Sequence, residues 1–142
     1  MAWTTPATAV AGTVLTAAWL NTYVRDNTAY LYLSSPRAAE YDNGNSGTTK
    51  TIDWATNGPL QKVTRTGNCT YTLTAPSVPS TLVLKFIHET GTSTAYTVTY
   101  SPTVKNPSGT AFSFTNTTAA IDIVTFYWDG TSYYVVGQAN FS

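Results

Sequence analysis

Apolar and polar residues alternate with two different periods along the chain, a helical period near the N-terminus and a strand period beyond it. Between Thr16 and Ser34, apolar residues recur at intervals of three and four, the spacing of a helix with one apolar stripe. Thr16 is a favourable N-cap residue, and Ser34-Ser35-Pro36 ends the pattern. The pattern therefore predicts one helix of roughly four turns.

The apolar stripe of this helix has the spacing of a short coiled-coil seam with a polar Asn inside it. Its members are Ala17, Leu20, Val24, Asn27 and Leu31. Such a seam favours a parallel bundle of identical helices, although two heptads alone are too short to hold chains together in water. An equally good interpretation is that the stripe packs on the chain's own sheet.

From Ala38 onward, short runs of β-branched and aromatic residues are separated by clusters of Gly, Pro and Asn. Seven or eight strands with this spacing are typical of a β-sandwich or jelly roll. We therefore expect a mainly β fold preceded by one α-helix. Residues 1–35 would form an extended arm and an attachment helix, and residues 36–142 would form the β-sandwich domain.

Three strand pairs are expected in this domain. They are Leu60–Thr66 with Cys69–Thr74, Thr81–His88 with Ala95–Ser101, and Ile121–Trp128 with Ser132–Gly137. The dipeptides Gly67-Asn68 and Asp129-Gly130 fit two-residue hairpin turns for the first and last pairs. In the strand Ile121–Trp128 both faces carry apolar residues, so it should be a central strand or be covered by a neighbouring subunit.

Charge is sparse and balanced, with seven Lys and Arg against seven Asp and Glu, and charged residues make up 10% of the chain. An ordinary soluble domain has about a quarter. A neutral chain without a basic cluster argues against nucleic acid as a partner, and low net charge favours association. The sequence also shows neither a membrane-spanning stretch nor an export signal, which predicts synthesis in a cytoplasm and no membrane insertion.

Side chains that could carry chemistry are few. One cysteine, Cys69, and one histidine, His88, are too few soft ligands for a zinc site, and no cofactor motif is present. His88 has no assignable nucleophile partner. A glycoside hydrolase would need two carboxylates, and the candidates are Glu40, Asp42, Asp53 and Asp122. We interpret Glu40, Asp42 and Asp53 as loop and strand-edge residues and predict that the protein is not an enzyme.

Three aromatic residues near the C-terminus, Trp128, Tyr133 and Tyr134, fit two kinds of contact. Exposed aromatic rings stack on sugars, so they could recognise a surface glycan. The interpretation we favour places them in the core or at a subunit interface.

The segment Ala11–Leu31, AGTVLTAAWLNTYVRDNTAYL, resembles the opening segment of many tailed-bacteriophage virion proteins, in which a VLTAA-xLN-xxVRDN pattern precedes a variable body. Residues 45–73 and 119–142 are similar to a β-domain that recurs in tail-fibre and head-decoration proteins. The resemblance touches most of the chain.

This resemblance implies a protein of the virion surface, commonly a homotrimer, with no catalytic residues. Its N-terminal segment, including Trp3, would dock on a capsid or tail protein, and the β-domain would face outward. The chain has no repetitive shaft and no separate tip after the β-domain. It therefore fits a capsid decoration, cement or short head-fibre protein better than a tail-fibre module that recognises a host surface glycan.

Overall fold

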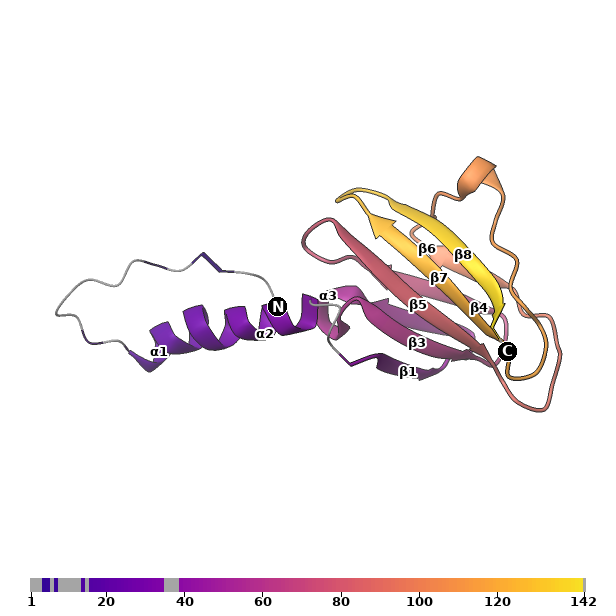
Figure 1. Ribbon diagram of the computed structural model, residues 1–142, viewed down its shortest axis with the longest axis horizontal. Coiled ribbons are helices and arrows are strands. Elements are labelled where there is room, and N and C mark those ends of the chain that lie inside the picture. Colours follow the sequence, from indigo (N-terminus) through magenta and orange to yellow (C-terminus); the bar gives the residue numbers. More distant parts are fainter. Residues whose placement is uncertain (1–3, 6, 8–13, 15, 35–38, 142) are drawn as a thin grey trace.

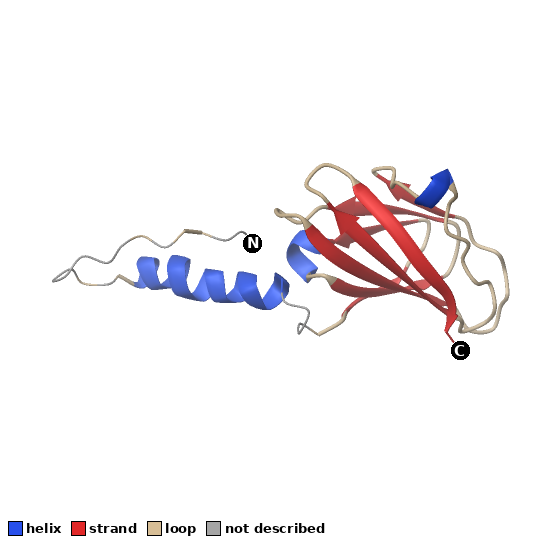
Figure 2. Ribbon diagram, turned by 45° about the horizontal axis from the view of Figure 1, so that its top comes forward, coloured by secondary structure: helices blue, strands red, loops and turns tan. Residues whose placement is uncertain are grey.

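The computed structural model describes residues 4, 5, 7, 14, 16–34 and 39–141. It consists of a helix that projects from a domain of two β-sheets (Figures 1 and 2). The predicted fold class, a mainly β chain with one helix before the β-domain, is confirmed. Trp3, which we expected to take part in docking, lies outside the described residues.

The N-terminal helix is continuous but changes its hydrogen-bond pattern. It comprises α1 (Ala17–Leu20), the π-helical η1 (Asn21–Asp26) and α2 (Asn27–Ser34). Thr16 caps it as predicted, because its side-chain oxygen accepts a hydrogen bond from the backbone N–H of Trp19 at 3.2 Å. The predicted helix limits are confirmed, whereas the π segment has no signal in the sequence.

The β-domain is built from a five-stranded and a three-stranded sheet. The first, sheet A, has the order β1-β3-β5-β7-β8, and the second, sheet B, has the order β2-β4-β6. In chain order the strands are β1 (Tyr41–Asn45), β2 (Thr49–Asp53), β3 (Leu60–Arg65), β4 (Cys69–Thr74), β5 (Ser80–His88), β6 (Val98–Ser101), β7 (Ile121–Trp128) and β8 (Tyr133–Phe141). Two short helices, α3 (Trp54–Asn57) and the 3-10 helix η2 (Pro107–Gly109), lie between strands.

The chain alternates between the two sheets, so the first six strands pair in parallel rather than as hairpins. β3 lies between β1 and β5 in sheet A, and β4 lies between β2 and β6 in sheet B. Two expected strand pairs are therefore wrong: β3 does not pair with β4, and β5 does not pair with β6. Each crossing instead lets the apolar faces of successive strands meet across one core.

The segment Gly67-Asn68 shows why the first expected hairpin does not form. Gly67 lacks the positive φ that the first central residue of a type II′ turn requires. The Asn68 side chain accepts a hydrogen bond from the backbone N–H of Thr97 at 2.8 Å, and the backbone N–H of Cys69 donates to the carbonyl of Thr97. Asn68 thus links the start of β4 to Thr97, the residue directly before β6.

The last hairpin, between β7 and β8, forms as predicted through Asp129-Gly130. Gly130 has a φ of 102°, and one carboxylate oxygen of Asp129 accepts hydrogen bonds from the backbone N–H groups of Thr131 and Ser132. β5 and β8 flank β7, so β7 is internal in its sheet. Its inner residues Val124 and Phe126 are fully buried in the core.

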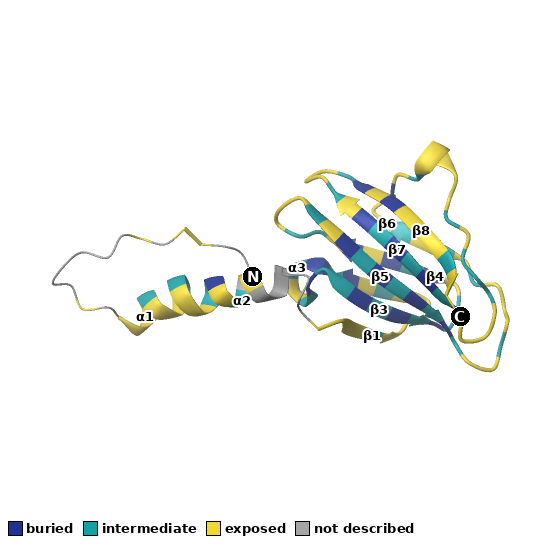
Figure 3. Ribbon diagram, viewed as in Figure 1, coloured by how far each residue is buried: buried dark blue, intermediate teal, exposed yellow. Residues whose placement is uncertain are grey.

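The core lies between the inner faces of the two sheets (Figure 3). The predicted alternation in β4 is confirmed, because Tyr71 and Leu73 are buried while Thr72 and Thr74 are exposed. Fully buried side chains from both sheets make up its centre: Ile52, Val63, Tyr71, Leu84, Phe86, Val124 and Phe126.

Candidate functional site

The predicted seam of the N-terminal helix is exposed in the single chain. Leu20 is 44% exposed and Val24 51% exposed, and the helix points away from the β-domain (Figures 1 and 3). Ala17 and Leu31 are also exposed. The interpretation in which this stripe packs on the chain's own sheet is therefore wrong.

Asn27, the polar member of the predicted seam, lies apart from the exposed Leu20 and Val24. Its side chain is 3% exposed and forms a pair of hydrogen bonds with the main chain of Thr4. The Asn27 amide donates to the Thr4 carbonyl at 2.7 Å, and its Oδ1 accepts from the Thr4 N–H at 2.9 Å. Thr4 thus lies against the helix at Asn27.

The π segment explains the displacement of Asn27. A π turn contains one more residue than an α turn, so the residues beyond it are rotated by about 100° from the positions of a regular α-helix. Trp19 and Tyr23, whose ring centroids are 5.1 Å apart, are half-buried, while Leu20 and Val24 are exposed. One side of the helix therefore carries the more buried residues, and the other carries the exposed Leu20 and Val24.

The outer face of sheet A is a second apolar surface. On β7 it carries Ile121, Ile123 and Tyr127, of which Tyr127 is 49% exposed. Strand register places Phe141 beside Ile121 and Tyr134 beside Tyr127. The face also carries Lys62 and Lys85, which pair with Asp42 and Glu40. Its apolar side chains are Leu60, Val83, Ile87, Ile121, Ile123, Tyr127, Tyr134, Val136 and Phe141. We call this set the sheet A face.

The outer face of sheet B differs sharply from the sheet A face. Register aligns Thr49 with Thr70 and Thr99, and Thr51 with Thr72 and Ser101, while the residues between them point into the core. The outer face of sheet A therefore carries a cluster of apolar side chains over β7 and β8, and the outer face of sheet B presents hydroxyl groups.

The three aromatic residues singled out in the sequence are separated by the structure. Tyr133 is 1% exposed and belongs to the core, and Trp128 packs against it with ring centroids 4.6 Å apart. Tyr134 is 42% exposed on the sheet A face. Because successive residues of β8 point to opposite sides of the sheet, the three do not form one surface.

Tyr134 is instead grouped with Tyr127 and Lys105 at a shallow groove of about 400 Å³. The two tyrosine rings are 6.3 Å apart and tilted by 39°, and the Lys105 ammonium lies 4.9 Å from the centre of the Tyr134 ring. Asn106 and Val136 also line the groove. The alternation of β7 placed Tyr127 on one face with Ile121 and Ile123, but Lys105 had no signal in the sequence.

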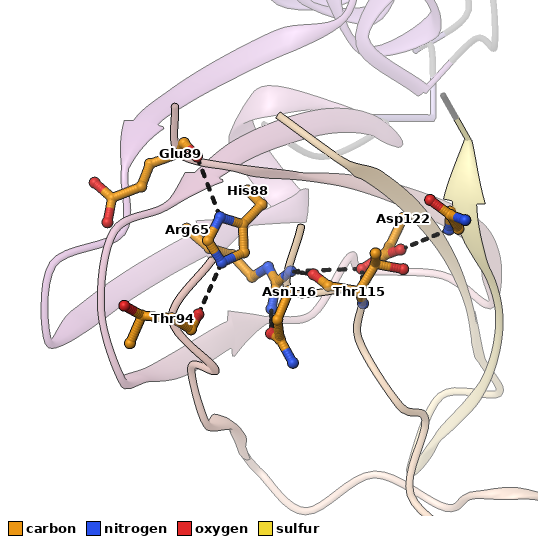
Figure 4. A network of polar contacts seen from close by, with 8 residues as sticks. Arg65, His88, Glu89, Thr94, Thr115, Asn116 and Asp122 are labelled. Atoms are coloured by element: carbon orange, nitrogen blue, oxygen red, sulfur yellow. Dashed lines mark hydrogen bonds and ion pairs between the residues drawn. The ribbon is translucent and has the colours of Figure 1, made fainter. Parts of the chain in front are cut away.

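A buried polar network closes one end of the sandwich (Figure 4). Arg65 and Asp122 are 1% and 0% exposed, and their Nη2 and Oδ2 atoms are 3.6 Å apart. Asp122 accepts hydrogen bonds from the backbone N–H groups of Thr115 and Asn140, at 2.8 and 2.9 Å. Burial lowers the pKa of Arg65, and the charge of Asp122 partly offsets this effect.

The Arg65 guanidinium has several partners besides Asp122. It donates to the carbonyl of Thr115 and to the side-chain oxygen of Asn116, and it lies 5.0 Å from the centre of the Phe114 ring. The network therefore ties β3 and β7 to the loop before β7. We interpret the pair as a structural ion pair, because both groups are shielded from solvent.

His88 and Cys69 are likewise engaged in the interior. The ring nitrogens of His88 face the carbonyls of Thr94 at 2.9 Å and Glu89 at 3.2 Å, and the ring stacks on Tyr96 (Figure 4). Cys69 is 4% exposed, and burial raises the pKa of its thiol. Neither side chain is placed to react with an external molecule.

The candidate carboxylates are dispersed rather than paired. Glu40 forms an ion pair with Lys85 at 2.7 Å, and Asp42 forms one with Lys62 at 3.2 Å. Asp53 caps α3 by accepting the backbone N–H of Thr56, and Asp122 binds Arg65. Each acid thus has a structural partner, and the structure does not bring them together at a groove.

The described residues contain no cluster of three His, Cys, Asp or Glu side chains that could hold a metal ion. No helix among them is long and apolar enough to cross a membrane.

Comparison with known proteins finds no matching family model, no significantly similar curated protein and no significantly similar solved structure.

Proposed function

We propose that this chain is a non-enzymatic structural subunit of a bacteriophage particle that associates with copies of itself. The observation that carries the proposal is the exposed stripe of Leu20 and Val24 on a helix that projects away from its own β-domain. Its spacing suits a parallel bundle, and the observed fold leaves it for another chain to cover.

The sheet A face supports the same proposal. Two heptads cannot hold helices together alone, so a second contact is needed. The exposed residues Tyr127, Tyr134 and Val136 provide apolar surface for it, and burying such surface is worth about 25 cal/mol per Å². Repeated around a symmetry axis, these contacts add up.

The phage assignment and the homotrimer rest on the resemblance of Ala11–Leu31 to the opening segment of phage virion proteins. In this proposal the arm docks on a capsid or tail protein at the virion surface, and the chain acts as a capsid decoration, cement or short head-fibre protein. Tight packing on such a particle suits the low charge of the chain.

The test is the mass of the purified chain by light scattering, with Val24→Asp as the variant. Wild type should have the mass of three chains of 15.3 kDa each, and V24D should have the mass of one, because a buried carboxylate at the seam is unfavourable. Thr74→Asp, an equal charge change at an exposed site on sheet B, serves as the control and should stay trimeric. A monomeric wild type, or a trimeric V24D, refutes the proposal.

A second candidate function, recognition of a host surface glycan, is favoured by the groove at Tyr127 and Tyr134. Aromatic rings can stack on a sugar, while Lys105 and Asn106 offer hydrogen-bond donors. The sheet A face cannot bind a glycan and join subunits at the same time, so a variant that removes both tyrosine rings separates the two roles.

The double variant Tyr127→Ala/Tyr134→Ala is compared with Tyr41→Ala, an exposed tyrosine on β1. Glycan recognition predicts that the double variant keeps its mass but loses binding to purified host polysaccharide. If the face joins subunits instead, the double variant loses mass. Equal polysaccharide binding by the double variant and wild type excludes the glycan role of this groove.

A further inference from the structure

Asn27 has a different position in the sequence-predicted seam from the one that it has in the structure. The sequence spacing places it in the seam with Leu20 and Val24, whereas in the structure its side chain is buried and paired with Thr4. The amide donates one hydrogen bond to the Thr4 main chain and accepts one from it, and the side chain is 3% exposed, so in this state it cannot pair with another chain. An Asn in a seam needs these groups, because Asn side chains pair across helices there.

We propose that the arm is an autoinhibitory clamp: pairing of Thr4 with Asn27 holds the single chain in a state that must open before Asn27 can join the seam. The inference rests on the proposed self-association and adds its regulation. The partner that replaces the arm is a second copy of this helix.

The π segment gives Asn27 the orientation in which it pairs with Thr4. Asn21–Asp26 lies directly before Asn27, and the extra residue in its turn directs Asn27 toward the arm. Conversion of this segment to regular α-helix rotates Asn27 back by about 100°, into line with the exposed side. Release of Thr4 and loss of the π turn therefore belong to one transition.

Thermodynamic linkage gives the size of the effect. A neutral hydrogen bond stabilises by an amount that corresponds to about fivefold in an equilibrium constant. Removing one Thr4–Asn27 bond should therefore favour opening about fivefold per chain. For three chains the association constant rises by about two orders of magnitude, so the midpoint concentration of a trimer falls by about tenfold.

The experiment uses the full chain with Thr4→Pro, which removes the backbone N–H that donates a hydrogen bond to Oδ1 of Asn27. Thr4→Ala is the matched control, because it changes the side chain and leaves both main-chain groups in place. A chain that begins at residue 8 is the second variant, since it lacks Thr4 altogether. Sedimentation velocity over a dilution series gives the midpoint concentration of assembly for each.

The clamp predicts that T4P, which loses one bond, assembles at about tenfold lower concentration than wild type and T4A, and that the shortened chain, which loses both, assembles at about a hundredfold lower concentration. An unchanged or higher midpoint for both overturns it, because the arm would then be neutral or would support assembly. If no chain assembles at any concentration, the proposed function fails as well, so the two failures are distinguishable. As a direct readout, the Thr4 amide should exchange its hydrogen slowly in the monomer and rapidly in the assembly; slow exchange in both also overturns the clamp.

Discussion

Replacing Asp122 by Ala should destabilise the β-domain strongly. The change leaves the Arg65 guanidinium buried without its counter-charge and removes the acceptor of the Thr115 and Asn140 N–H groups. Breaking a buried ion pair by removing one partner costs about 3–5 kcal/mol. Because small domains are stable by about 5–15 kcal/mol, D122A should remove at least about a fifth of the total.

A double-mutant cycle separates the ion pair from the hydrogen bonds around it. Asp122→Asn loses the charge and keeps only one of the two oxygens that accept backbone hydrogen bonds, and Arg65→Met removes the guanidinium while filling similar space. The lost backbone bond is common to the single and the double variant, so it cancels in the cycle. The double variant should be less destabilised than the sum of the two single variants, by about 1–3 kcal/mol, because neither charge is then left alone.

The free energy of unfolding is measured by urea titration with tryptophan fluorescence, for which buried Trp54 is a reporter. All variants carry Val24→Asp, so that self-association does not add to the measured stability. A loss below about 1 kcal/mol for D122A would refute the structural role of the pair. Strict additivity of D122N and R65M would show that the two charges do not interact.

Two further predictions concern packing and pH. Gly137→Ala should lower the free energy of unfolding by about 1–3 kcal/mol, because the added Cβ would lie 2.5 and 2.6 Å from ring atoms of Phe112. Gly67→Ala is the control, because its added Cβ has its nearest contact at 3.6 Å. Equal urea midpoints for the two variants would contradict the clash. Backbone hydrogen bonds from Ser132 and Thr131 lower the pKa of Asp129 below its ordinary value of 3.8, so its ionised form contributes stability above that pH and loses it as the pH falls through the lowered pKa. The stability difference between wild type and Asp129→Asn should therefore be present at pH 7 and vanish in strong acid, and a difference that stays constant with pH would be inconsistent with this account.

The sequence predicted the features that depend on near neighbours. The Thr16 cap, the ends of the helix and the Asp129-Gly130 hairpin each follow from a few adjacent residues, and all three are present. The Gly67-Asn68 hairpin failed because its outcome depends on Thr97, which lies in the next turn of the chain. The dipeptide alone does not show whether the strand that follows it pairs with the strand before it or belongs to the other sheet.

The interaction surfaces were predicted in part. Spacing identified Leu20 and Val24 as a stripe, and the structure confirms that the chain leaves them exposed. The displacement of Asn27 could not be foreseen, because the change from α to π hydrogen bonding depends on the backbone and on Thr4. The Arg65–Asp122 pair had a usable signal, since Arg65 is in phase with buried Val63 and Asp122 with buried Val124, which puts both charges on the core faces of their strands.

The alternation of strands between the two sheets also bears on how the chain folds. β1, β3 and β5 each pair with a strand from another turn of the chain, and β7 and β8 form the local hairpin among the described strands. Non-local pairing requires loops to close before contacts form, which slows folding. Because β7 pairs with β5, sheet A is complete only after the C-terminal end of the chain has been made. During synthesis the N-terminal helix therefore leaves the ribosome before β7 and β8, and it can contact Thr4 or another copy of the helix before the β-domain is folded.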